Sequence, residues 1–159
     1  MPTQQQIDFM RRAIALATAN VSAGRGGPFG AVIVRDGQLL AEAANSVTET
    51  NDPTAHAEVN AIRLACRKLG SFSLDGCEIY TSCEPCPMCL AAIYWARIDA
   101  IYYGNTAAEA ARVNFDDAFL YRELALPHQS RSIPSTQLLG DEAWESFQAW
   151  QNSASKIHY

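Results

Sequence analysis

Two short segments carry side chains whose types and spacing suit a metal ion. The letters HAE occupy positions 56–58, and the letters PCPMC occupy positions 85–89. His56, Cys86 and Cys89 offer one imidazole and two thiolates, which are donors that zinc prefers in a tetrahedral site. The two-residue gap between the cysteines lets both sulfurs reach one ion from a turn that enters a helix, where the thiolate form is favoured. The sequence therefore predicts one zinc ion (Zn2+) per subunit at this place.

The number of protein ligands separates two kinds of zinc site. A structural site is closed by four protein donors, whereas a catalytic site holds three and keeps a position for water. Cys83 lies three residues before Cys86, so spacing alone does not choose the cysteine pair, and a structural zinc knuckle with Cys83 as the fourth ligand is the alternative. That alternative leaves Glu58 without a role. Beside an open zinc position, Glu58 is placed to move protons from a water whose pKa zinc lowers to about 7.

The combination of the two motifs is more specific than either motif alone. HAE followed about 27 residues later by PCxxC matches the signature of the zinc nucleobase deaminases. The combination therefore favours a catalytic zinc site, with Glu58 as the catalytic residue.

The segments around these motifs predict a layered α/β domain. Residues 7–21 carry one apolar helical face, which Thr3 could cap and Gly24 could end. The other expected elements are strands at 31–34, 39–44, 78–82 and 100–103 and helices at 57–69 and 87–95. Their alternation implies a mixed sheet between helices, and both metal motifs begin a helix. The tail from residue 105 is less regular, with helical pieces near 107–112 and 142–152.

Length and charge limit the classes of protein that fit. A chain of 159 residues suits a single domain, with 1–104 as the core and 105–159 as a segment for substrate and dimer contacts. Its net charge is −5 and it has no basic stripe, so nucleic acid is not expected as a partner. No uncharged run is long enough to cross a membrane, and no secretory signal is visible, so a cytoplasmic protein is expected.

The amino-acid sequences of four segments resemble those of the bacterial guanine deaminases in the cytidine-deaminase-like superfamily. These segments are GGPFGAVIV, NDPTAHAEVNAIR, YTSCEPCPMCLAAIYWAR and FDDAFLYRE. The resemblance implies a three-layer α/β/α sandwich with a mixed sheet of about five strands. It also implies a homodimer with shared active sites, in which the C-terminal segment is exchanged between subunits and brings Asp117 and Tyr159 to the partner's site.

The same resemblance implies roles for individual residues. His56, Cys86 and Cys89 would bind zinc, and Glu58 would carry protons. The residues expected to bind the substrate are Phe29, Asn45, Ala57 through its backbone amide, Trp95, Asp117 and Tyr159. Simpler roles compete: Asn45 suits a turn, Phe29 and Trp95 suit a core, and Asp117 could cap the helix that starts at Ala118.

The implied activity is hydrolytic deamination of guanine, a small-molecule purine, to xanthine and ammonia. The alternatives are deamination of guanosine, cytidine or tRNA adenosine, or a zinc-stabilised binding module without turnover. Residues 120–159 hold three Lys and Arg against four Asp and Glu, which disfavours a tail that binds RNA phosphates.

Overall fold

A computed structural model describes every residue from Met1 to Tyr159. The chain forms two compact units, residues 1–118 and residues 119–159. Its elements, in chain order, are α1 (Gln4–Ser22), β1 (Gly30–Arg35), β2 (Gln38–Ala44), α2 (Val47–Thr50), α3 (Ala57–Leu69), β3 (Cys77–Cys83), α4 (Pro87–Trp95), β4 (Ala100–Asn105), α5 (Ala107–Ala111), α6 (Asp117–Ala125), the 3-10 helix η1 (His128–Ser130) and α7 (Gly140–Asn152). None of its helices has the length and apolar character that a bilayer crossing requires.

The first unit contains a mixed sheet with the strand order β2-β1-β3-β4. Strand β1 is antiparallel to both β2 and β3, and β3 is parallel to β4. The sheet therefore has four strands, and the expected number of about five was too high. The chain leaves β4 for a helix because the Thr106 hydroxyl accepts from the backbone N–H of Glu109, and the Glu109 carboxylate accepts from that of Thr106.

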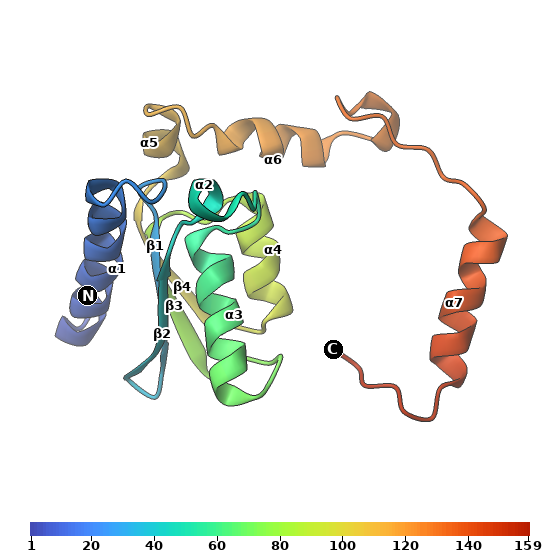
Figure 1. Ribbon diagram of the computed structural model, residues 1–159, viewed down its shortest axis with the longest axis horizontal. Helices are drawn as coiled ribbons and strands as arrows, with labels where there is room; N and C mark the ends of the chain where they lie inside the picture. The colour runs from blue at the N-terminus through green and yellow to red at the C-terminus, as the bar shows by residue number, and fades with distance from the viewer. The chain divides into compact units, whose positions relative to one another are not determined.

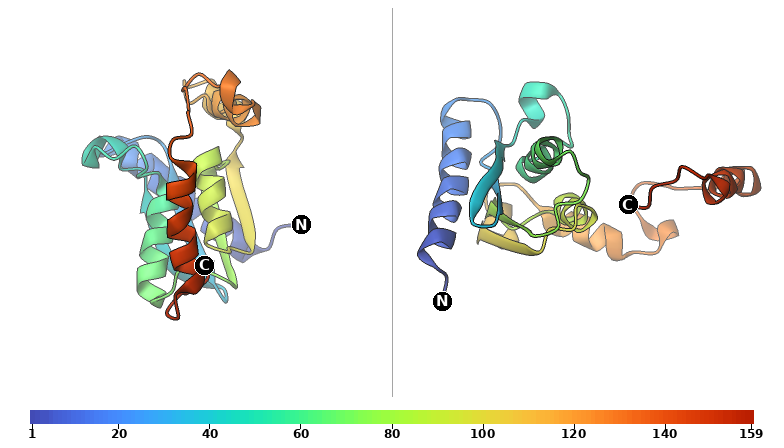
Figure 2. Two further views of the ribbon diagram at one scale, coloured as in Figure 1. Left: turned by 90° about the vertical axis from the view of Figure 1, so that its right-hand side faces the viewer. Right: turned by 90° about the horizontal axis from the view of Figure 1, so that it is seen from below.

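Helices cover both faces of this sheet, which confirms the three-layer α/β/α arrangement (Figures 1 and 2). Successive residues of β1 point to opposite faces. Val32 and Val34 belong to the core under α1, whereas Ala31 and Ile33 belong to the core under α3 and α4. The three fully buried alanines of α3 let that helix lie close to the sheet: Ala57, Ala61 and Ala65.

The two metal motifs begin helices, as the sequence predicts. His56 is the N-cap of α3, and Cys86 is the N-cap of α4. Pro87 occupies the first turn of α4, where its missing N–H leaves no hydrogen bond unmade. The bounds of both helices agree with the predicted bounds, and Gly70 ends α3 in a left-handed conformation.

The strand pairing brings several loops to one edge of the sheet. Gly30 at the start of β1 pairs with Ala44 at the end of β2. Cys83 at the end of β3 pairs with Asn105 at the end of β4. Because β1 and β3 are antiparallel, the start of β1 and the end of β3 meet at this same edge. The loops that leave this edge carry the residues of the candidate site.

The second unit, residues 119–159, contains the rest of α6, η1 and α7. No residue of α7 is buried. Trp144, Phe147 and Trp150 recur at helical spacing along α7, and all three side chains are exposed.

Candidate metal centre and active site

Three side chains from the two helix starts converge on one point. The Nδ1 atom of His56 lies 3.6 Å from the Sγ atom of Cys86 and 3.4 Å from the Sγ atom of Cys89. Tetrahedral zinc bonds of about 2.3 Å to sulfur and about 2.0–2.1 Å to nitrogen would place these ligand atoms about 3.5 Å apart. The donor set and its spacing therefore fit a zinc ion.

The surroundings of Cys86 favour the thiolate form that zinc binds. Cys86 and Cys89 are buried. The pKa of the Cys86 thiol is lowered to about 4, first because the Cys89 side chain stabilises its thiolate by a hydrogen bond, and also because of His56. The N-cap position of Cys86 adds the positive end of α4. A thiolate ligand is thus available at neutral pH.

Cys83, the alternative zinc ligand, lies outside this cluster. The group of side chains that could hold a metal consists of His56, Cys86 and Cys89. The Sγ atom of Cys83 instead lies 3.9 Å from the carbonyl oxygen of Thr106. Burial raises the pKa of the Cys83 thiol to about 11, so this side chain stays protonated. The three-residue set agrees with a catalytic zinc site, which has three protein ligands and keeps its fourth position for water.

Glu58 lies beside the metal cluster on the first turn of α3. The residue is only 7% exposed, and this burial is the main reason that its pKa is raised. Glu58, His56 and Cys86 open into a cavity of about 260 Å³, which we call the Glu58 cavity. A buried carboxyl group next to a metal site and an open cavity is placed to exchange protons with a bound ligand.

Three of the predicted substrate residues line the Glu58 cavity: Phe29, Asn45 and Asp117. Asp117 is half-buried, and burial followed by the negative charge of Cys86 raises its pKa. Asp117 follows the short helix α5 in the chain and lines this cavity in its own subunit, and its expected role in a partner's site stays a prediction. Ala57 is buried directly after the ligand His56.

Trp95 and Tyr159 are placed differently. Trp95 is the last residue of α4, is 67% exposed and does not line the Glu58 cavity. Tyr159 belongs to the second unit. A role for either residue in substrate binding stays a prediction.

Phe115 also lines the Glu58 cavity and was missed by the sequence analysis. Its ring packs edge-on against Phe29, with the ring centroids 4.8 Å apart and an interplanar angle of 84°. Phe115 stands two residues before Asp117, so the segment FDD contained a signal for it. Glu84 was missed as well. It lines the cavity and accepts a hydrogen bond from the backbone N–H of Ala107.

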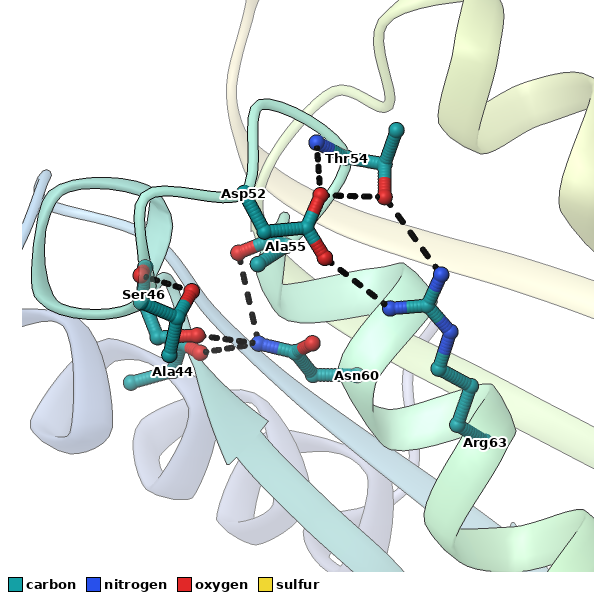
Figure 3. Close-up of polar contacts among 8 residues, drawn as sticks. Ala44, Ser46, Asp52, Thr54, Ala55, Asn60 and Arg63 are labelled. Atoms are coloured by element: carbon teal, nitrogen blue, oxygen red, sulfur yellow. Dashed lines mark hydrogen bonds and ion pairs between the residues drawn. The ribbon is translucent and has the colours of Figure 1, made fainter.

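Asn60 of α3 fixes the loop between Asn45 and His56 (Figure 3). Its Nδ2 group lies 3.1 Å from the carbonyl oxygen of Ala44 and 3.3 Å from that of Ala55. These two residues directly precede Asn45 and His56 in the chain. The Asn60 amide thus couples the metal ligand to the end of β2.

Comparisons with known proteins agree with this geometry. Residues 3–105 match the family described as the cytidine and deoxycytidylate deaminase zinc-binding region. Guanine deaminase from Bacillus subtilis is 56% identical over 95% of this chain and 97% of its own. The X-ray structure of guanine deaminase from Bacillus subtilis superposes with a TM-score of 0.93 and 55% identity, over 96% of this chain and 97% of that chain.

A more distant relative matches only part of the chain. A tRNA-specific adenosine deaminase from Agrobacterium fabrum is 52% identical over 48% of this chain and 51% of its own. The shared residues, the zinc ligand geometry and the full-length similarity lead to one conclusion: the chain belongs to the zinc-binding cytidine and deoxycytidylate deaminase family.

Proposed function

We propose that this protein catalyses the zinc-dependent hydrolytic deamination of guanine to xanthine and ammonia. One observation carries the proposal: the cavity beside the three metal ligands and Glu58 also contains Asn45 and Asp117, which can bind the polar edges of a purine. The full-length similarity to a guanine deaminase supports this base over others.

The zinc ligands and Glu58 have separate roles in this reaction. Zinc held by His56, Cys86 and Cys89 would supply the activation of a water molecule for attack on the ring carbon that bears the amino group. Glu58 takes a proton from that water, delivers it to the adjacent ring nitrogen and then helps to protonate the departing amine. Guanine and one water thus become xanthine and ammonia, and Glu58 ends in its starting state.

Recognition of the base falls to the other residues of the Glu58 cavity. Asp117 accepts hydrogen bonds from N–H groups of guanine, which adenine lacks at the equivalent edge. A site with a buried polar group left unpaired rejects the wrong base strongly. Phe29 and Phe115 offer aromatic surface for the base. The backbone amide of Ala57, at the first position of α3, donates to a ring acceptor.

We further propose a cytoplasmic homodimer that acts in purine metabolism, with residues 119–159 exchanged between subunits. The exposed aromatic side chains of α7 support an interface, because a second copy would remove Trp144, Phe147 and Trp150 from water. In such a dimer Tyr159 closes the partner's cavity as a lid. A reducing compartment suits the proposal, because the zinc site needs Cys86 and Cys89 as thiolates.

An assay of ammonia release tests the proposed reaction. Zinc-loaded protein is incubated with guanine, guanosine, cytosine, cytidine and adenine, with xanthine measured as the second product. We expect turnover of guanine above the others, and loss of turnover when a chelator removes zinc. Zinc-dependent folding without ammonia release from any base would instead support the binding module.

A further inference from the structure

The amide of Asn45 is held in one orientation. Its Oδ1 atom accepts hydrogen bonds from the backbone N–H groups of Gly27 and Val47, each at 3.3 Å. Both partners are donors, so the accepting atom must be the oxygen. The Nδ2 group of Asn45 makes no hydrogen bond within the protein. Every buried side-chain nitrogen in the structure has a partner, so this Nδ2 atom is not fully buried. Because Asn45 lines the Glu58 cavity, its Nδ2 group is available as a donor to a bound base.

Asn20 of α1 holds the same two segments from the other side. Asn20 is only 6% exposed. Its Nδ2 group donates to the carbonyl oxygen of Gly27 at 2.9 Å and to that of Asn45 at 2.8 Å. A primary amide has two N–H bonds, and both are used in these two hydrogen bonds. We call this pair of hydrogen bonds from Asn20 the clamp. Gly27 and Asn45 are therefore joined twice, through the Asn20 side chain and through the Oδ1 atom of Asn45.

The space around this clamp is closed to any further atom. A Cβ atom on Gly26 would lie 2.6 Å from the carbonyl oxygen of Asn45, 2.9 Å from its Oδ1 and 3.0 Å from the Nδ2 of Asn20. The first of these contacts is with backbone, which cannot rotate away. Gly26 thus allows Asn20 and Asn45 to approach each other.

The clamp also reaches the aromatic wall of the cavity. The carbonyl oxygen of Gly27 accepts a second hydrogen bond, from the backbone N–H of Phe29 at 2.8 Å. Asn20 therefore holds both Asn45, which offers a donor to the base, and the turn at Gly27 that positions Phe29.

We propose that Asn20 is a positioning residue for substrate binding, which keeps the Nδ2 donor of Asn45 directed at the base without touching the base itself. The proposal rests on the proposed function, because it assigns Asn45 to substrate recognition. Nothing in the sequence marks Asn20, which stands inside a helix among small and apolar residues.

A double-mutant cycle with Asn45 tests this role. Asn20→Asp keeps the size of the side chain but replaces the two N–H donors by an oxygen that faces two carbonyl oxygens. We expect the dissociation constant of 8-azaguanine, measured by calorimetry on zinc-loaded protein in a Glu58→Gln background, to rise about tenfold. With Asn45→Ala also present, Asn20→Asp should raise that constant by less than about twofold, because the residue through which it acts is gone.

Turnover measurements give a second readout. With Glu58 intact, Asn20→Asp should raise KM for guanine about tenfold and leave kcat within about threefold. Asn51→Asp is the matched control, since it makes the same chemical change at an exposed residue and should alter neither constant. Zinc content and Tm report whether each variant is folded. If Asn20→Asp does not fold, Asn20→Ser and Gly26→Ala disturb the same clamp from its two sides.

The outcomes separate this inference from the proposed function. An equal rise of the dissociation constant with and without Asn45→Ala would mean that Asn20 has only a structural role, and would overturn the inference. Unchanged binding in all three clamp variants would overturn it as well. A wild-type protein that neither binds 8-azaguanine nor deaminates guanine would instead remove the proposed function.

Discussion

Replacement of Glu58 by glutamine removes the group that carries every proton transfer in the proposed reaction. Glutamine has nearly the same shape, and Glu58 is 93% buried, so a larger change would disturb packing between α3 and the metal cluster. General acid–base catalysis contributes about 10²–10⁴-fold. Because no other carboxyl group lies on the first turn of α3 beside the ligands, we expect kcat for guanine to fall by at least about 10²-fold, or about 2.7 kcal/mol in the barrier.

The assay must separate lost chemistry from lost zinc. Xanthine formation is followed by absorbance, and zinc content is measured on the same samples. Glu58→Gln should keep one zinc per chain and a Tm close to that of the wild type. Glu49→Gln is the matched control, because Glu49 is exposed and does not line the Glu58 cavity. A Glu58→Gln protein that retains zinc and more than about a tenth of wild-type kcat would refute the assignment and would direct attention to Glu84 or Asp117.

Three further predictions concern recognition, assembly and stability. Asp117→Asn should lower kcat/KM for guanine about 10–100-fold in steady-state assays, because a charged acceptor is lost. Glu58→Gln and Tyr159→Ala subunits, refolded together at equal amounts, should regain about a quarter of wild-type activity if Tyr159 serves the partner's site, and none if it serves its own. Arg12 holds the pKa of Glu42 below its usual value by a hydrogen bond, so Glu42→Gln should lower the free energy of unfolding by up to about 1 kcal/mol at pH 7. That difference should disappear in urea titrations as the pH falls through the lowered folded-state pKa of Glu42, because the protonated carboxyl no longer pairs.

Local signals made the metal cluster predictable. The three ligands stand in two short motifs, and each motif begins a helix, with Pro87 in the first turn of α4 and Gly70 at the end of α3. The helices at 57–69 and 87–95 therefore have the predicted bounds. The spacing alone left open which two cysteines bind zinc. The answer depends on where each side chain lies, because Cys83 ends β3 near the carbonyl oxygen of Thr106, whereas Cys86 and Cys89 lie at the start of α4.

Contacts between distant segments were not predictable in the same way. Phe115 meets Phe29 across 86 residues, and Asn20 meets Asn45 across 25, without a periodic pattern that would reveal either pair. Trp95 lies in a helix that is apolar on all sides, so its sequence could not show which side chains face the cavity. The number of about five strands came from the resemblance, whereas the four strands expected from the residues themselves are the four that the structure contains.

The position of Asn45 also depends on the far end of the hairpin. Asp36 and Gly37 both have positive φ, as a two-residue turn that matches strand twist requires, and this turn pairs Arg35 with Gln38. Continued without interruption, that register would pair Gly30 with Ala43. The structure pairs Gly30 with Ala44 because Leu40 is an extra residue in β2, opposite the register shift between Ile33 and Val34.

The extra residue decides which face of the sheet each side chain of β2 reaches. A shift of one residue would turn the side chains beyond Leu40 to the opposite face and move Asn45 by about 3.3 Å along the strand. The hydrogen bond from the backbone N–H of Gly27 to Oδ1 of Asn45 is already 3.3 Å long and would not survive such a shift. The bulge at Leu40 is thus part of what places a hydrogen-bond donor in the Glu58 cavity, although it lies at the middle of the hairpin and touches no residue of the metal cluster.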